Sequence, residues 1–147
     1  MISENISPWF LRDINKLKEE ISLYENDNDL WLLKGDVKNS AGTLALHIIG
    51  NLRHFIGTQL GNTGYIRNRD QEFSDRNIPR EIILKEIDEV ISIVQKVLPA
   101  IADEKFRSEY PIEFLGEKRS VGEMLFILYG HLNYHLGQVN YHRREAQ

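Results

Sequence analysis

Apolar residues recur at three- and four-residue steps in four stretches of this chain, which is the spacing of one face of an α-helix. The first stretch covers about residues 8–24. Ser7 is predicted to be its N-cap, and Pro8 occupies the first helical position, where a missing backbone N–H costs nothing. The pattern therefore predicts an amphipathic helix near the start of the chain.

The second apolar stretch begins at Asn39 or Ser40 and reaches about Leu60. A polar segment follows at residues 62–77, and three apolar residues are spaced to anchor it: Tyr65, Ile66 and Phe73. A loop of this length inside a small domain is often functional. We therefore expect an ordered crossover loop rather than a flexible linker.

Two further helices are predicted in the second half of the chain. Pro79 opens the third helix and Pro99 ends or kinks it, before an irregular segment at 103–119. Ser120 and Glu123 have the spacing of a capping box, which predicts the start of the fourth helix. Four amphipathic helices indicate an all-α fold, a four-helix bundle, and the long polar segment indicates at least one crossover connection.

Composition excludes several classes of protein. The 147 residues suffice for a single domain, residues 1–147, with a buried core. The net charge is −4 and the pI is about 5.7, so the chain lacks the basic surface of a nucleic-acid binder. Without cysteine it has no disulfide, no thiolate metal ligand and no cysteine nucleophile. No transmembrane run and no signal peptide is recognisable, so we expect a cytoplasmic protein that does not contact membranes.

The histidines are the main candidates for chemistry, and all five fall on the second and fourth predicted helices: His47, His54, His131, His135 and His142. His131 and His135 are one turn apart and lie beside the apolar stripe of their helix. Such a pair can chelate one divalent metal ion. A third histidine from a facing helix leaves one tetrahedral position open, as catalytic metal sites require. Neutral imidazole suits zinc, nickel, copper or iron.

Other interpretations of the histidine pair remain open at this point. A histidine beside an apolar face is often a hydrogen-bonded core residue, so a structural role is an alternative. The H-x-x-x-H spacing also matches that of zincin metalloproteases. Leu132, however, stands where their catalytic glutamate would be, which argues against a protease.

Three segments resemble the DinB/YfiT-like superfamily of bacterial four-helix-bundle proteins: residues 46–57, 71–84 and 120–144. The most specific parts are the histidine on the second helix, the loop before the third, and an H-x-x-x-H-x-G-Q motif that runs from His131 to Gln138. The positions that correspond to the family's metal ligands are His47, His131 and His135. The resemblance therefore implies that these three residues bind a divalent metal ion, zinc or nickel.

The same resemblance implies a metal-dependent transferase that activates a small-molecule thiol, such as bacillithiol, mycothiol or glutathione, and transfers it to an electrophilic substrate. Asn51, one turn after His47, is expected to face this site, where it either bonds the substrate or a metal ligand or is simply a polar residue at a seam between two helices. Two alternatives stay open. One is a metal-dependent hydrolase, and the other is a non-catalytic, stress-related bundle whose histidines are structural.

Some residues near the predicted site have two interpretations. Gln138 either orients a ligand or bonds a neighbouring helix. His54 and His142 follow His47 and His135 by seven residues, roughly 10 Å along a helix, and are therefore interpreted as rim or interface residues.

Two surface features complete the sequence predictions. Tyr134 and Tyr141, with Ile127, form a row on an adjoining face of the fourth helix, which favours a homodimer. Four arginines gather in and after the crossover loop: Arg67, Arg69, Arg76 and Arg80. They would either recognise an anionic substrate or form a solvated loop balanced by neighbouring acids, and the acidic neighbours favour the second interpretation.

Overall fold

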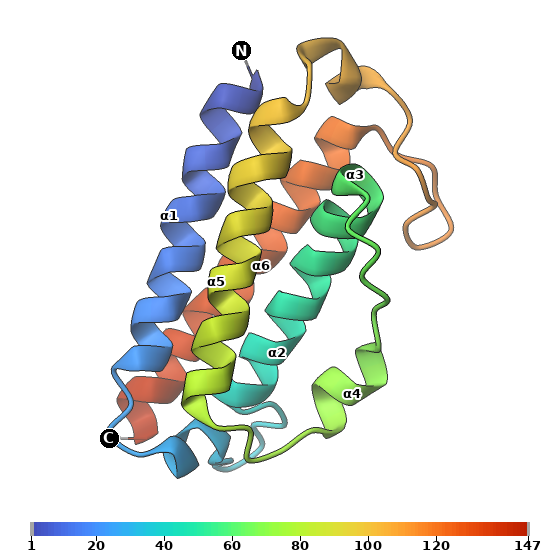
Figure 1. Ribbon diagram of the computed structural model, residues 1–147. Coiled ribbons are helices and arrows are strands. Elements are labelled where there is room, and N and C mark those ends of the chain that lie inside the picture. The colour runs from blue at the N-terminus through green and yellow to red at the C-terminus, as the bar shows by residue number, and fades with distance from the viewer. Residues whose placement is uncertain (1, 147) are drawn as a thin grey trace.

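Four long helices form the body of the protein in a computed structural model that describes the backbone of residues 2–146 and the side chains of residues 5–146 (Figure 1). They are α1 (Ile2–Ser22), α2 (Ala41–Leu52), α5 (Arg80–Val97) and α6 (Val121–Ala146). The described residues contain no strand, only isolated bridges at Glu109–Ser120 and Phe114–Glu117. The predicted all-α four-helix bundle is confirmed.

Shorter helical segments extend or connect these four. A π-helical turn (Arg53–Thr58) and α3 (Gln59–Gly61) continue α2, and α4 (Arg69–Ser74) lies in the crossover loop. Three 3-10 turns complete the set: Asp27–Trp31, Leu98–Ala100 and Asp103–Arg107. No helix in the described part of the chain is both long enough and apolar enough to cross a membrane.

The long loop between α2 and α5 determines the topology of the bundle. It returns along the side of the molecule from the end of α3 to the start of α5, so α2 and α5 run in the same direction (Figure 1). α1 and α6 run in the opposite direction, and α6 is therefore antiparallel to α2. The predicted crossover connection is present, and it carries α4 along the outside of α2.

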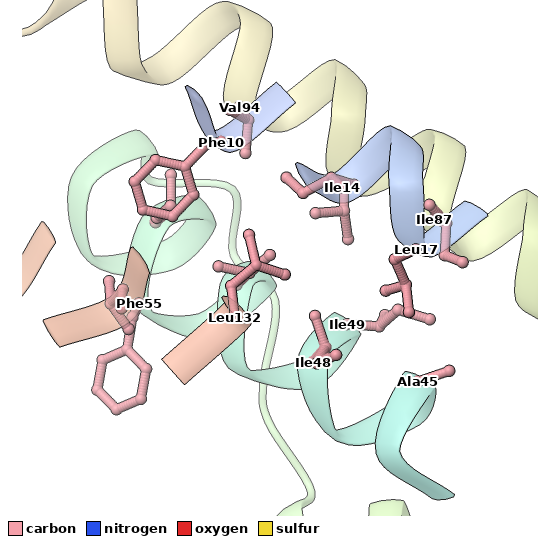
Figure 2. Close-up of a cluster of buried hydrophobic side chains, with 14 of the residues drawn as sticks. Phe10, Ile14, Leu17, Ala45, Ile48, Ile49, Phe55, Ile87, Val94 and Leu132 are labelled. Atoms are coloured by element: carbon pink, nitrogen blue, oxygen red, sulfur yellow. The ribbon is translucent and has the colours of Figure 1, made fainter. Parts of the chain in front are cut away.

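The apolar stripes of the four helices meet in one core (Figure 2). Ile14 and Leu17 of α1, Ile48 of α2, Ile87 of α5 and Leu132 of α6 all expose 1% of their surface or less. Burying a side chain of this size contributes about 1.5–3 kcal/mol relative to leaving it in water. The three- and four-residue spacing seen in the sequence therefore gives the dominant stabilising contacts.

Local capping signals place the starts of the two helices that carry the histidines. The Ser40 side chain accepts a hydrogen bond from the backbone N–H of Thr43, one of the first unpaired donors of α2. At α6, the Glu123 carboxylate accepts from the Ser120 backbone N–H, and Ser120 Oγ accepts in turn from the Glu123 N–H. The predicted capping box is confirmed.

Two local predictions are wrong. α1 begins at Ile2 rather than at Pro8, so Pro8 lies inside the helix and Ser7 is not its N-cap. Ile6 packs against the core and Ser7 is buried, and these contacts favour helical backbone before the proline. In the crossover loop, Ile66 is 89% exposed and anchors nothing, whereas Tyr65 and Phe73 are half-buried as predicted.

The π-helical turn after α2 did not follow from the apolar pattern. It is held from outside by Tyr110, whose buried hydroxyl donates a 2.6 Å hydrogen bond to the carbonyl of Phe55. π turns are rare and frequently occur near functional sites. This one begins two residues after Asn51.

Candidate metal centre

Three histidine side chains from two antiparallel helices converge at one point between α2 and α6. Nε2 of His47 lies 3.0 Å from Nε2 of His131, and Nε2 of His135 lies 3.1 Å from that same atom. One ligand nitrogen of each residue lies within 4.8 Å of the other two. In a tetrahedral site with Zn–N bonds of 2.0–2.1 Å, ligand nitrogens are separated by about 3.3 Å. The three nitrogens are thus close to the spacing that one metal ion requires.

The outer nitrogens of two of these rings are held by other side chains. Nδ1 of His47 donates to Oε1 of Glu72 at 3.0 Å, and Nδ1 of His135 donates to Oε1 of Gln138 at 2.7 Å. An acceptor at Nδ1 favours the tautomer that carries its proton there and leaves the Nε2 lone pair free. Gln138 therefore orients a neighbour within its own helix.

Glu72 is the main residue of this cluster that the sequence analysis missed. It comes from α4 and is only 6% exposed. Arg67 binds both of its oxygens, with Nε 2.9 Å from Oε2 and Nη2 2.9 Å from Oε1. Burial raises the pKa of Glu72, but hydrogen bonds from Arg67 and His47 outweigh it and lower that pKa below its usual value. The carboxylate is therefore ionised at neutral pH.

Gly50 makes room for this carboxylate on the surface of α2. A Cβ atom built on Gly50 would lie 1.9 Å from Oε2 of Glu72, far inside contact distance. Only glycine at this position lets the α4 carboxylate approach the helix that carries His47. A glycine inside an otherwise apolar helix was the one signal in the sequence that another group packs closely there.

Two histidines of the cluster, His131 and His135, have pKa values below the usual value of a histidine. Burial, together with the neighbouring His135 and His47 rings and Arg67, lowers the pKa of His131 to about 4, although Glu72 acts in the opposite direction. Burial also lowers the pKa of His135. Because a metal ion binds imidazole in its neutral form, these rings need not lose a proton to become ligands at pH 7.

A pocket of about 330 Å³ opens beside His47 and His131. Eight other residues line it: Asn51, Phe55, Arg67, Arg69, Phe114, Leu115, Ile127 and Leu128. Asn51 is 6% exposed, and its buried Oδ1 has no hydrogen-bond partner among the described residues. No aspartate or glutamate of the described residues lines this pocket. A larger pocket, about 470 Å³, is lined by Gln138 and His142 but by none of the three clustered histidines.

The remaining histidines lie outside the cluster, as predicted. His142 accepts at Nδ1 from the Tyr24 hydroxyl and donates from Nε2 to the Leu32 carbonyl, both at 2.7 Å. It joins α6 to the segment after α1 and is a structural residue. His54 packs edge-on against the Phe55 ring in the π-helical turn.

The four arginines near the crossover loop have different environments. Arg67 is bound to Glu72, Arg80 pairs with Asp27, and Arg76 donates to backbone carbonyls. Acids therefore balance Arg67 and Arg80, as in the second interpretation, whereas Arg76 donates to the backbone oxygens of Phe73 and Asp75. Arg69 is different, because it lines the pocket and its guanidinium lies over the Phe73 ring.

Comparisons with known proteins agree with this architecture. The fold is similar to the crystal structure of a DinB-like protein from Bacillus cereus ATCC 10987, with a TM-score of 0.75 and 16% sequence identity over 97% of this chain and 91% of that chain. No curated protein matches the sequence. Residues 10–147 match the family described as "Protein of unknown function (DUF1572)", which is a DinB-like family. The chain therefore belongs to the DUF1572 family and has the DinB-like fold.

Proposed function

We propose that His47, His131 and His135 bind one divalent metal ion, zinc or nickel, through their Nε2 atoms. The observation that carries the proposal is the convergence of three imidazole nitrogens. The donor set fits such an ion, because hydrogen bonds at Nδ1, to Glu72 from His47 and to Gln138 from His135, orient two of the rings. Three protein ligands leave a fourth position for water or substrate, as in catalytic sites.

We further propose that the protein transfers a small-molecule thiol to an electrophilic substrate in the adjoining pocket. A divalent metal ion favours the deprotonated form of a thiol or of water at neutral pH, and so supplies a nucleophile. In the transfer, the thiol proton leaves to solvent and the sulfur forms a bond to the electrophilic carbon. The bond from that carbon to its leaving group breaks, and the leaving group takes the electron pair.

The pocket lining supports thiol transfer over hydrolysis. Direct hydrolysis benefits from a carboxylate that accepts a proton from the attacking water. The described pocket lining contains no carboxylate, and both oxygens of Glu72 are engaged by Arg67 and His47. A thiol loses its proton more readily than water and needs no such base. Transfer to an electrophile is therefore the reaction that these residues serve best.

Asn51 is the residue that we propose to contact the reacting molecule. Its side-chain amide is buried beside His47 with an unpaired oxygen, and a buried polar group without a partner is costly. A substrate with a hydrogen-bonding group at this end of the pocket would satisfy it. Phe55, Leu128 and Ile127 supply apolar walls that exclude water from the bound substrate.

A thiol-transfer assay with zinc-loaded, nickel-loaded and metal-stripped protein tests this function. Bacillithiol and glutathione would be offered with monochlorobimane, whose product fluoresces. We expect a rate that depends on the metal ion, is absent in His135→Ala and falls at least tenfold in Asn51→Ala. Metal-dependent cleavage of a nitrophenyl ester without thiol transfer would favour the hydrolase. No turnover in either assay would favour the non-catalytic bundle.

We also propose that the protein is a homodimer formed through α6. Phe126, Tyr134 and Tyr141 are 78%, 66% and 70% exposed, and Gly130 and Gly137 lie on the same stripe with open space above them. Ile127 of the predicted row instead packs against the core. In a two-fold symmetric contact, the aromatic side chains of one copy would pack into the open space above Gly130 and Gly137 of the other. Light scattering after gel filtration should give twice the monomer mass, and the monomer mass for Phe126→Glu/Tyr141→Glu.

A further inference from the structure

We propose that the pocket beside the three histidines selects a small organic anion: a molecule with an apolar body, one carboxylate bound by Arg69 and a polar group bonded by Asn51. The inference rests on the proposed function in one respect, because such a molecule would be the electrophilic substrate rather than the thiol. The carboxylate preference itself depends on the pocket residues alone. It is therefore testable without any metal ion.

The charge distribution around the pocket leaves one cation available to a ligand. Two arginines line the pocket, but the charge of Arg67 is already paired with Glu72, whose two oxygens accept from its Nε and Nη2. Arg69 has no ion pair and no hydrogen bond to its guanidinium within the part of the chain that the structure describes. Its guanidinium carbon lies over the face of the Phe73 ring, 4.9 Å from the ring centroid. A guanidinium stacked on an aromatic ring keeps its N–H edges free for a carboxylate.

The walls of the pocket favour a ligand with an apolar body. Five of the ten lining residues are apolar: Phe55, Phe114, Leu115, Ile127 and Leu128. A hydrophilic sugar or peptide would leave its polar groups unpaired against these side chains, whereas an aromatic or branched aliphatic group would not. The volume of about 330 Å³ suits a small molecule.

Leu115 is held in an unfavourable conformation at the rim of this pocket. Its φ of +54°, followed by +76° at Gly116, forms a two-residue turn closed by paired hydrogen bonds between Phe114 and Glu117. Leucine is strained in this left-handed region, and its side chain is 85% exposed, so burial in the fold does not offset the strain. We infer that the exposed Leu115 side chain packs against the apolar body of a bound ligand, and that this contact offsets the backbone strain.

Asn51 is the second polar contact that we propose for the ligand. Its amide lies next to His47, is nine-tenths buried and lacks a partner at Oδ1. Sites built to hydrogen-bond a ligand group discriminate strongly against molecules that lack it, because the site's own polar atom is then left unpaired. A carbonyl, hydroxyl or amide group beside Asn51 would complete the contact.

Titration of the whole chain with cinnamate and with cinnamyl alcohol, followed by amide chemical shifts in NMR spectra, tests the carboxylate preference. The two probes share an aromatic body and differ in charge. We expect metal-free wild-type protein to bind cinnamate five- to tenfold more tightly than the alcohol. Arg69→Gln should remove that preference, while Arg144→Gln, which deletes the same charge outside the pocket, should keep it.

Leu115→Gly provides a second, independent readout. Glycine suits the left-handed turn, so the variant should be at least as stable as the wild type, yet it should bind both probes severalfold more weakly. Equal affinity for the two probes, a preference that survives Arg69→Gln, or no binding of either at millimolar concentration would overturn the proposal. If the protein shows this preference but fails to bind zinc or nickel when they are added, the metal site is refuted and the pocket is not, so the two proposals fail separately.

Discussion

Oε1 of Glu72 lies 3.0 Å from Nδ1 of His47, although the two residues are 25 positions apart and belong to different helices. The contact links α4 of the crossover loop to α2. It joins Arg67, Glu72 and His47 in one partly buried chain of charge-assisted hydrogen bonds that ends at the three Nε2 atoms. The crossover loop therefore has a direct role at the candidate metal centre.

Replacing this carboxylate should weaken metal binding without unfolding the protein. Glu72→Gln keeps the shape of the side chain but removes the charge that holds His47 and pairs with Arg67. Loss of such an outer partner typically costs about 10–100-fold in metal affinity. We expect a zinc dissociation constant raised by about tenfold or more, measured by competition with a chromophoric chelator. Glu86→Gln, which removes an equal charge from an ion pair with Arg53, is the control and should leave zinc affinity unchanged.

A substitution on the opposite helix should have the same consequence. In Gly50→Ala the new methyl group occupies the position of the Glu72 carboxylate, whose flexible side chain must then move away from His47. We expect zinc affinity to fall to the level of Glu72→Gln. The double variant should be no weaker than either single one, because both remove the same contact. Gly130→Ala, a helical glycine with open space, is the matched control. Additive losses in the double variant would contradict this account.

Asp13, which is not part of the metal centre, should make the free energy of unfolding depend on pH. Burial raises the pKa of Asp13, but hydrogen bonds from Arg12, Tyr129 and Asn133 outweigh it and lower that pKa to about 2. The Tyr129 hydroxyl donates at 2.6 Å and Arg12 at 2.7 Å. The folded state thus binds fewer protons than the unfolded state between the unfolded value of 3.8 and about 2. The stabilisation is fully present above about pH 4 and is lost as the pH falls toward 2.

Urea unfolding at a series of pH values checks this dependence. At pH 5, Asp13→Asn should be less stable than the wild type by about 1–3 kcal/mol, because charged hydrogen bonds are replaced by neutral ones. The difference should shrink as the pH falls from 4 to 2. A constant difference across that range would show that the Asp13 carboxylate is not the titrating group. Asp36→Asn, at an exposed position, should have little effect at any pH.

Much of the fold could be predicted because its determinants are local. The capping box between Ser120 and Glu123 needs only residues three positions apart, and the apolar stripes need only helical periodicity. The spacing of His131 and His135 likewise brought them to one side of α6. Pro8 shows the limit of such rules, since packing of Ile6 against the core outweighs the local preference for proline at a helix start.

The candidate site was predicted only in part because its remaining members come from elsewhere in the chain. Neither histidine helix carries a carboxylate beside the cluster, as the sequence indicates, but α4 supplies one from the crossover loop. The approach of Glu72 depends on the three-dimensional path of residues 62–79, which no periodicity encodes. Similarly, the difference between Arg67 and Arg69 follows from which of them reaches Glu72.

The metal content of the protein tests the central claim most directly. Untagged protein, purified without chelators, would be analysed by elemental mass spectrometry beside His135→Ala and His54→Ala. The second variant removes a histidine outside the cluster. We predict about one zinc or nickel ion per chain in the wild type and in His54→Ala, and none in His135→Ala. No bound metal after incubation with zinc and nickel, or equal metal in His135→Ala, would contradict the three-histidine site.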